Sequence, residues 1–326
     1  MKLILNNKSE KLSNTFFRNT KFLKFVFLVC IMILLLLKIK TLHITSALFF
    51  ETLITLRGNL AYFLAAIALL FLNYFFEISK WNLLSTQIEA RSFRDSTIEV
   101  LRGLRVGLLT PFMIGDFLGR SIDFKKEHRA EAMALNMFNS ACQTYTAIVF
   151  GGMAFLFWWN LSTDSLKNLL IFPNILLIIS TFLGLFFVLK IKFSWHFLAK
   201  GKIIRPYLEA SKMDINLSNV LRMKVLMLSF GRTLVYNLQF WLFYISLGVD
   251  LPKVIIFIGV NLMLLVKTVG GGLNVFGDLT LREFISVHFF GIYHANGGLI
   301  LIATFVVWLM NIFLPVIIGL FLKPKI

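Results

Sequence analysis

The sequence LAYFLAAIALLFLNYFF, at residues 60–76, is an almost unbroken apolar run of 17 residues. With a rise of ~1.5 Å per residue, a helix of this length is about as short as a membrane-spanning helix can be. The whole chain of 326 residues has the same character, because 58% of it is hydrophobic, only 15% is charged, and the mean hydropathy is +0.81. Soluble domains carry ~25% charged residues. A water-soluble enzyme is therefore excluded, and the sequence predicts a membrane protein.

Further apolar runs predict an all-α, polytopic integral membrane protein with seven to eight transmembrane helices. They lie at residues 22–37, 132–159, 168–189, 225–247, 254–266 and 298–322, and residues 284–294 leave an eighth crossing open. The first run could be a signal peptide, but its basic leader is long and no small-x-small cleavage site follows it. We therefore expect a cytoplasmic leader (1–21), a single transmembrane domain (22–322) and a short tail (323–326).

Basic residues are concentrated between the apolar runs. The chain has 33 Lys and Arg against 16 Asp and Glu, a net charge of +17, and most basic residues lie in 1–24, 77–131 and 190–224. This distribution follows the positive-inside rule and predicts a multi-pass protein of a bacterial inner membrane with a cytoplasmic N-terminus. Residues 77–105 are expected to hold an amphipathic, interfacial helix on that side. Nucleic acid is not an expected partner, because the basic stretches do not form a soluble module interleaved with stacking aromatics.

Two glycine-rich segments interrupt the apolar pattern. Residues 107–120 read GLLTPFMIGDFLGR, residues 267–283 read KTVGGGLNVFGDLTLRE, and both contain Gly-Asp-x-x-x-Arg with aspartates 162 positions apart. Such breaks at corresponding positions of two halves point to a substrate site between broken helices of a transporter-like fold. We predict broken or re-entrant segments near 107–120 and 268–284, and an internal two-fold repeat would relate them. The helix-breaking residues are Pro111, Gly115, Gly270, Gly271, Gly272 and Gly277.

Charged residues near these breaks are the candidate substrate-binding residues. They are Asp116, Arg120, Arg232, Asp278, Arg282 and Glu283. Two Asp/Arg pairs have i, i+4 spacing, so each acid would lie over its base on one helix face. Surface ion pairs at the interface are the alternative interpretation. Arg232 lies within an apolar run, where a charge costs about 2.5–3.5 kcal/mol, and Asp116, Asp278 and Glu283 are its candidate partners. Lys267 is expected to extend to the membrane surface.

The sequence does not support metal or hydrolytic chemistry. Its five histidines show no His-Glu-x-x-His spacing, and no Gly-x-Ser-x-Gly elbow or Walker A loop is present, so we expect no enzyme activity, metal or cofactor. An intramembrane aspartyl protease is the enzyme alternative, since both membrane aspartates follow a glycine. That family requires Gly-x-Gly-Asp, whereas Met113 and Phe276 occupy the first glycine positions. The arginine four residues beyond each aspartate also favours its ionised form.

The segment from Pro111 to Arg120 resembles the flippase-like transmembrane domain of lysylphosphatidylglycerol synthases and their stand-alone relatives. That family carries Pro-x-Arg-x-Gly-Glu followed by a basic residue, and later a glycine-rich turn that ends in Arg-Glu. The matching residues are Pro111, Gly115, Asp116 and Arg120 in the first motif, with Asp replacing Glu, and Gly277, Arg282 and Glu283 in the second. Met113 departs from the family's arginine, and the usual Arg-x-x-Asp of the following helix is not evident.

By order of hydropathy the resemblance spans roughly residues 20–322. It implies a helical fold with re-entrant segments that moves a lipid or lipid-linked headgroup between leaflets. It does not imply aminoacylation, because the transferase domain of the longer relatives is absent. We therefore expect a lipid translocase whose partners are anionic membrane phospholipids. The alternative is a non-transporting scaffold that docks a separate lipid-modifying enzyme through its basic loops.

Overall fold

The computed structural model describes residues 46–108, 110, 113–189, 217–269 and 275–321. By its backbone contacts the chain from Phe50 on is a unit separate from the residues before it, and the fold described below is that of this unit. The apolar run 22–37, the leader 1–21, the tail 323–326, Pro111 and Gly270 to Gly272 lie outside the described residues. The expectations for these segments stay predictions.

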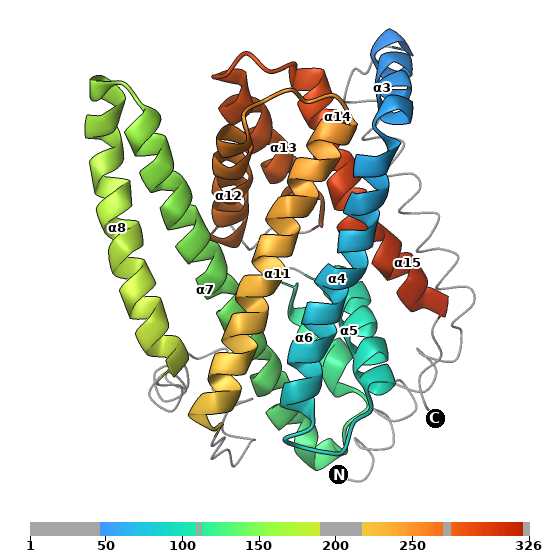
Figure 1. Cartoon of the computed structure of the whole chain (residues 1–326). Helices are drawn as coiled ribbons and strands as arrows, with labels where there is room; N and C mark the ends of the chain where they lie inside the picture. Colours follow the sequence, from blue (N-terminus) through green and yellow to red (C-terminus); the bar gives the residue numbers. More distant parts are fainter. Residues whose placement is uncertain (1–45, 109, 111–112, 190–216, 270–274, 322–326) are drawn as a thin grey trace, which may run out of the picture. The chain divides into compact units, whose positions relative to one another are not determined.

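The described residues form helices and contain no strand, which confirms the all-α prediction for this part of the chain (Figure 1). The α-helices are α3 (Ser46–Gly58), α4 (Leu60–Ser85), α5 (Phe93–Leu108), α6 (Ile114–Ser121), α7 (Arg129–Leu161), α8 (Asp164–Leu189), α11 (Asn219–Ser246), α12 (Lys253–Val269), α13 (Val275–Gly291), α14 (Gly297–Trp308) and α15 (Leu314–Phe321). A 3₁₀ turn, η2 (Lys126–His128), precedes α7, and a π-helical segment, η3 (Leu309–Phe313), joins α14 to α15.

Four helical stretches are long and apolar enough to cross a membrane. They are Leu60–Ser85, Lys126–Leu161, Lys167–Phe186 and Gly297–Gly319. The third stretch, in α8, exposes most of its apolar side chains, including Phe172 and Phe182. Exposed apolar surface of this extent is what lipid requires and water penalises. These helices support a membrane protein, whereas the total of seven to eight crossings stays a prediction.

Helix α4 is longer than the apolar run that predicts it. The run ends at Phe76, but the helix continues to Ser85 and carries Glu77 and Lys80 into the interior, where they are 4% and 0% exposed. The prediction that a polar interfacial stretch starts at Glu77 is therefore wrong, because Glu77 is a buried residue of α4. Hydropathy shows where charged residues begin. It does not show where the helix ends, because a helix continues for as long as its backbone hydrogen bonds are made.

Helices α4 and α11 lie side by side and run antiparallel (Figure 1). Near the start of α4, the Ala66 carbonyl accepts a 3.1 Å hydrogen bond from Gln239, which lies late in α11. Later in α4, Glu77 contacts Arg232, which lies earlier in α11. The C-terminal end of α4 therefore lies beside the N-terminal end of α11.

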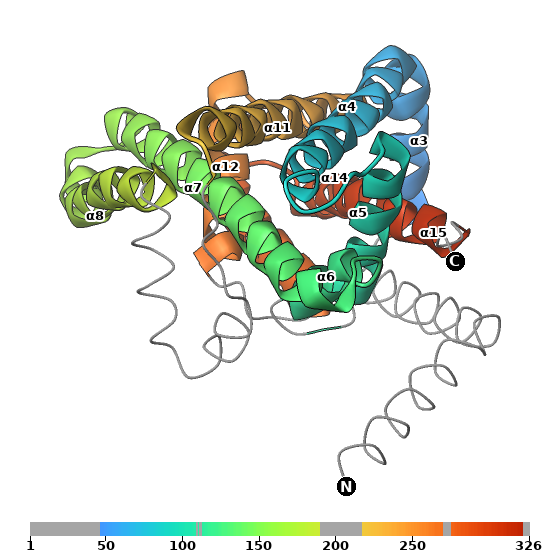
Figure 2. The same cartoon turned by 90° about the horizontal axis from the view of Figure 1, so that it is seen from below.

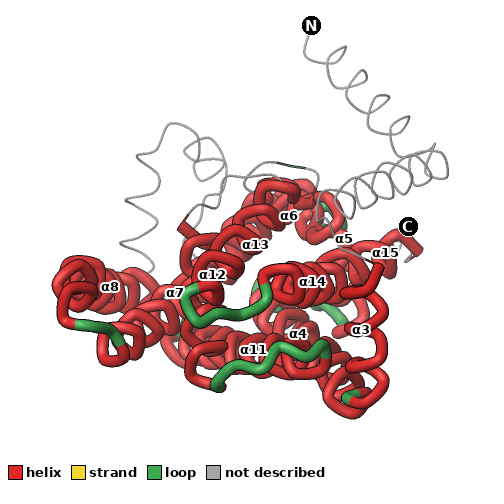
Figure 3. The backbone as a smooth tube through the Cα atoms, turned by 90° about the horizontal axis from the view of Figure 1, so that it is seen from above, coloured by secondary structure: helices red, strands yellow, loops and turns green. Residues whose placement is uncertain are grey.

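Two helical hairpins follow from this antiparallel arrangement. α5 and α6 form a hairpin between the C-terminal end of α4 and the start of α7, and α12 and α13 form a hairpin between the C-terminal end of α11 and the start of α14. Because α4 and α11 run in opposite directions, the two hairpins enter the helix bundle from opposite ends. The α5–α6 end faces the viewer in Figure 2, and the loops that lead into α12 and α14 face the viewer in Figure 3.

The helix order repeats with the offset that separates the two Gly-Asp-x-x-x-Arg motifs. Moved by the 162 positions between Asp116 and Asp278, the bounds of α4 and α5 fall within three residues of those of α11 and α12, and the start of α6 falls within one residue of the start of α13. Moved by the same offset, α7 covers the stretch that contains α14 and α15. Each motif thus lies on the second helix of its hairpin.

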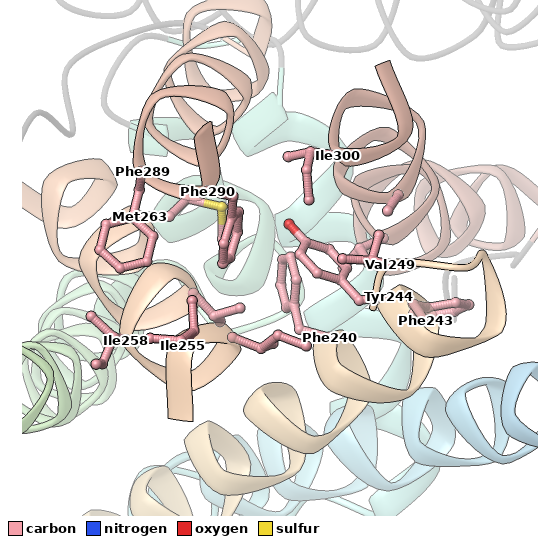
Figure 4. Close-up of a cluster of buried hydrophobic side chains, with 14 of the residues drawn as sticks. Phe240, Phe243, Tyr244, Val249, Ile255, Ile258, Met263, Phe289, Phe290 and Ile300 are labelled. Atoms are coloured by element: carbon pink, nitrogen blue, oxygen red, sulfur yellow. The ribbon is translucent and has the colours of Figure 1, made fainter. Parts of the chain in front are cut away.

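The larger apolar core lies between α11, α12, α13 and α14 (Figure 4). The Tyr244 ring packs edge-on against Phe240 and Phe290, with centroids 5.8 and 5.6 Å away, and its hydroxyl lies 2.8 Å from Thr304 Oγ1. The Tyr244 hydroxyl therefore has a hydrogen-bond partner although the side chain is fully buried. A second core joins α4, α5, α7 and α11 around Trp81 and Phe138.

The π-helical segment has a local cause. Pro315 has no N–H to donate to the carbonyl four residues earlier, which is that of Asn311. The Tyr74 hydroxyl donates a 2.7 Å hydrogen bond to this carbonyl instead, and the Asn311 side chain accepts a 3.0 Å bond from Asn73. The expected continuous helix over 298–322 is therefore interrupted where it contacts α4.

Close packing of α5 on α6 depends on glycines that face each other across the hairpin. A β-carbon added to Gly119 would lie 2.8 Å from Cα of Gly103 and 3.0 Å from the Arg102 carbonyl oxygen. We expect Gly119→Ala to lower the free energy of unfolding by about 1–3 kcal/mol, because both obstructing groups are backbone. Thermal unfolding of the detergent-solubilised protein measures this effect. Gly58→Ala is the matched control, since nothing lies within 4 Å of its added methyl. Equal stability of the two variants would contradict the close hairpin contact.

Candidate functional site

The carboxylate of Glu77 is the centre of a buried polar cluster between four helices. It accepts hydrogen bonds from Arg120 Nη2 of α6 at 2.9 Å and from Arg232 Nη1 of α11 at 2.6 Å. It also accepts bonds from Lys80 Nζ on its own helix and from Asn139 Nδ2 of α7, each at 2.9 Å. Three cations therefore share one buried acid. We call Glu77, Lys80, Asp116, Arg120 and Arg232 the central cluster.

The first hairpin positions Arg120 for this contact. Asp116 Oδ1 accepts a 2.9 Å bond from Arg120 Nε, which confirms the i, i+4 pair, and Asp116 Oδ2 accepts a 2.9 Å bond from Asn136 of α7. The turn before α6 is closed by a 2.7 Å bond from the Gly115 amide to the Thr110 hydroxyl. Gly103 leaves room for the Asp116 and Arg120 side chains, because an added β-carbon would collide with both. Backbone and side-chain bonds thus hold both charges in place.

Arg232 lies half-way along α11 and is neutralised by a residue that the sequence did not single out. Its Nη1 contacts Glu77, and its Nε donates a 2.8 Å bond to Asn73 Oδ1. The expected partners Asp116, Asp278 and Glu283 were therefore wrong choices. An arginine among apolar helices needs an acid, and α4 provides it at Glu77, the first residue after the apolar run 60–76.

The second motif forms a similar group on the other hairpin. Asp278 Oδ2 lies 3.0 Å from Arg282 Nε, which confirms the second i, i+4 pair, and Lys267 Nζ lies 3.9 Å from Asp278 Oδ1. Lys267 thus lies beside this acid. Arg282 Nη1 donates a 2.8 Å bond to the Tyr236 hydroxyl, one turn beyond Arg232 on α11. Both hairpins therefore place an arginine close to the middle of α11.

The remaining predicted residues that the structure describes lie within α13 and α6. Glu283 is 4% exposed and follows Arg282 in α13. Gly277 lies within α13 and Gly115 within α6, so the prediction that these two glycines break a helix is wrong: each lies in the first turn of a helix that continues past it. The sequence missed Glu77 and Lys80, and it missed Tyr236 as a partner of Arg282. The only signal was that α4 could continue beyond Phe76 with two charges three residues apart, a spacing that brings side chains together on a helix.

Positive charge exceeds negative charge in the central cluster. Within the described part of the chain, Lys80, Arg120 and Arg232 form ion pairs with two acids, Glu77 and Asp116. In addition, Nη1 of Arg120 is buried and has no hydrogen-bond partner among the described residues. An unpaired buried guanidinium donor is costly, and an anion would remove that cost. Among the described residues, no group of His, Cys, Asp and Glu could hold a metal ion.

A shallow, open apolar groove lies along the first half of α11, where Leu83 of α4 meets it. It has a volume of about 740 Å³ and is lined by Leu83, Asn219, Val220, Met223, Lys224, Met227 and Leu228. Leu228 lies one helical turn before Arg232, whose side chain is 27% exposed. The groove therefore begins where α4 ends and α11 starts, and it reaches to within a turn of the central cluster.

Glu99 on α5 is connected to the central cluster through Trp81, which contacts both Glu99 and Arg120. It is fully buried, accepts a 2.7 Å bond from Trp81 Nε1, and lies 3.4 Å from Arg91. The Arg120 guanidinium lies 5.5 Å from the centre of the Trp81 ring. Burial raises the pKa of Glu99 to about 7, although Trp81 and Arg91 act in the opposite direction.

The raised pKa of Glu99 gives a pH-dependent stability. A carboxyl group with a higher pKa in the folded state stabilises the fold below about pH 4.5, and this contribution is lost as pH rises through about 7. We expect Glu99→Gln to remove this part of the decline between pH 5 and pH 8, measured by thermal unfolding in detergent. Glu89→Gln, at the more exposed partner of Arg91, is the control. An identical pH profile in wild type and Glu99→Gln would contradict the assignment.

Comparison of the chain with protein-family models, with curated proteins and with solved structures gives no match. The geometry of the cluster and the motif residues in the sequence are therefore the basis for a functional assignment.

Proposed function

We propose that this protein is a lipid translocase that moves an anionic phospholipid, or a lipid-linked anionic headgroup, between leaflets. The observation that carries the proposal is the surplus of positive charge around the buried Glu77, together with the unpaired Nη1 of Arg120. Arginine binds phosphate oxygens through its planar fork of donors. A fixed positive surplus among apolar helices is therefore suited to a phosphate headgroup.

The groove along α11 supports a lipid rather than a small soluble anion. Its walls are mainly aliphatic and methionine side chains, which suit an acyl chain, and Lys224 and Asn219 are its polar members. If the acyl chain of a lipid lay in this groove, its headgroup could lie at the end of the groove near Leu228. The next charged residue beyond Leu228 on α11 is Arg232. The groove and the central cluster thus match the two ends of one amphipathic molecule.

The opposed hairpins support movement across the membrane. In this proposal α5–α6 and α12–α13 are re-entrant segments of an inverted repeat, related by the 162-residue offset. Inverted repeats with broken helices at mid-depth allow a site to open to either side. The domain would have seven to eight crossings, a cytoplasmic N-terminus and a place in a bacterial inner membrane. Its movement of lipid would be passive or coupled to a gradient.

The resemblance to the transmembrane domain of lysylphosphatidylglycerol synthases is part of the same proposal. Asp116 and Arg120, the matched residues of the first motif, lie in the central cluster. Arg282, matched in the second motif, contacts α11 one turn from it. A non-transporting scaffold is the second candidate, and the experiment below separates the two. The aspartyl protease alternative is disfavoured, because Asp116 and Asp278 lie on different hairpins and each pairs with its own arginine.

Leaflet exchange in reconstituted vesicles tests the proposal. Purified protein is placed in vesicles with fluorescent phosphatidylglycerol in both leaflets, and exchange is followed by chemical quenching of the outer leaflet. We expect Arg120→Gln and Arg282→Gln to slow exchange at least about tenfold, since each removes a buried phosphate-binding charge. Arg94→Gln, at an exposed position of α5, is the control and should exchange at the wild-type rate.

Two results would contradict the translocase. One is exchange by the wild-type protein that is no faster than in protein-free vesicles, which would favour the scaffold. The other is unchanged exchange in both Arg120→Gln and Arg282→Gln, which would remove the proposed site.

A further inference from the structure

The best anion-binding position in the central cluster is already filled by the protein itself. Two guanidinium groups, from Arg120 and Arg232, approach the Glu77 carboxylate at 2.9 and 2.6 Å. Two arginines on one group of oxygens is the arrangement that binds a phosphate tightly. A phosphate can be held by two nitrogens of each arginine only where Glu77 releases Nη2 of Arg120 and Nη1 of Arg232.

Glu77 keeps a counter-charge when the arginines leave it. Lys80 Nζ lies 2.9 Å from Glu77 Oε2, and Asn139 donates to Glu77 Oε1 at 2.9 Å. Lys80 is fully buried, and its other hydrogen bond is a 3.1 Å bond to the neutral Gln143 side chain. Among the described acids, Glu77 is the one that pairs with Lys80. Lys80 is therefore placed to hold Glu77 whether or not the arginines are present.

The arginines also have partners that do not depend on Glu77. Arg120 keeps Asp116 at 2.9 Å, and Arg232 keeps Asn73 at 2.8 Å. Transfer of both arginines from Glu77 to an incoming anion would leave no charge of the central cluster unpaired. The three cations and two acids would then be balanced by one added negative charge. A singly charged phosphate group, as in a phosphodiester headgroup, provides that charge.

We infer that Glu77 is an internal competitor for the substrate anion. A phosphate group binds by taking Arg120 and Arg232 from Glu77, and Lys80 is the positioning residue that retains the Glu77 carboxylate. This inference rests on the proposed function and adds a residue that sets affinity. If the role of Glu77 were purely structural, its loss would lower the stability of the fold and would not raise the affinity for the anion. A competitor has the opposite effect, since its removal raises affinity.

Equilibrium binding to the full-length, detergent-purified protein tests the inference. The probe is radiolabelled dioctanoyl phosphatidylglycerol, with inorganic phosphate as a second probe to separate recognition of the lipid from recognition of the free ion. We expect Glu77→Gln to bind the lipid about tenfold more tightly and Lys80→Gln about tenfold more weakly. The double variant E77Q/K80Q should bind as tightly as Glu77→Gln, because an uncharged residue 77 no longer competes.

The double variant also separates the inference from a folding defect. It removes one acid and one cation, so the charge balance of the central cluster is that of the wild type. Glu99→Gln, which removes a buried acid that contacts neither Arg120 nor Arg232, is the control and should leave affinity unchanged. Tighter binding of either probe by Glu77→Gln supports the inference. It is overturned if Glu77→Gln tightens neither probe, or if the double variant binds as weakly as Lys80→Gln.

Failure of this inference differs from failure of the proposed function. Tighter binding by Glu77→Gln, combined with no leaflet exchange by the wild type, would keep the competitor and reject the translocase. Leaflet exchange that depends on Arg120, combined with unchanged affinity in Glu77→Gln and in the double variant, would keep the translocase and reject Glu77 as a competitor.

Discussion

The shared ion pair of Glu77 with Arg120 and Arg232 is the constraint on which the rest of the structure depends. Each of these charges would be costly alone among apolar helices, and removal of one partner from such a group costs several kcal/mol, about 3–5. The contact joins α4, α6 and α11, so it fixes how far the first hairpin reaches along α4. It also fixes the antiparallel register of α4 on α11. Electrostatics therefore sets the arrangement here, and apolar packing fills the space around it.

Other polar contacts lie at the same level along α4 and α11 as this ion pair. Pro315 frees the Asn311 carbonyl, and Tyr74 and Asn73 of α4 bind the residue that Pro315 leaves without its helical partner. On the other side Tyr236 connects α11 to Arg282 of the second hairpin. The polar residues thus form a band across the middle of α11, and the apolar cores lie to either side of it along the helices. A band of this kind is expected where a polar group must pass between apolar walls.

The sequence predicted the local features well and the distant contacts poorly. Apolar runs located most of the described helices, and the spacing in the two Gly-Asp-x-x-x-Arg motifs predicted both Asp/Arg pairs correctly. The partner of Arg232 could not be found in this way, because it lies 155 residues away in the chain and one sequence contains no record of such pairings. Glu77 was also hidden by its position, since a charge at the end of an apolar run resembles the first residue of a loop. Only the packing of α11 on α4 distinguishes the two cases.

A structure determined in nanodiscs that contain phosphatidylglycerol tests the central claim most directly. The account expects density for a phosphate group within hydrogen-bonding distance of Arg232 and of Nη1 of Arg120, with Glu77 held by Lys80. It would be contradicted if, at saturating lipid, headgroups bound only at the helix ends and the space between these two arginines held no anion.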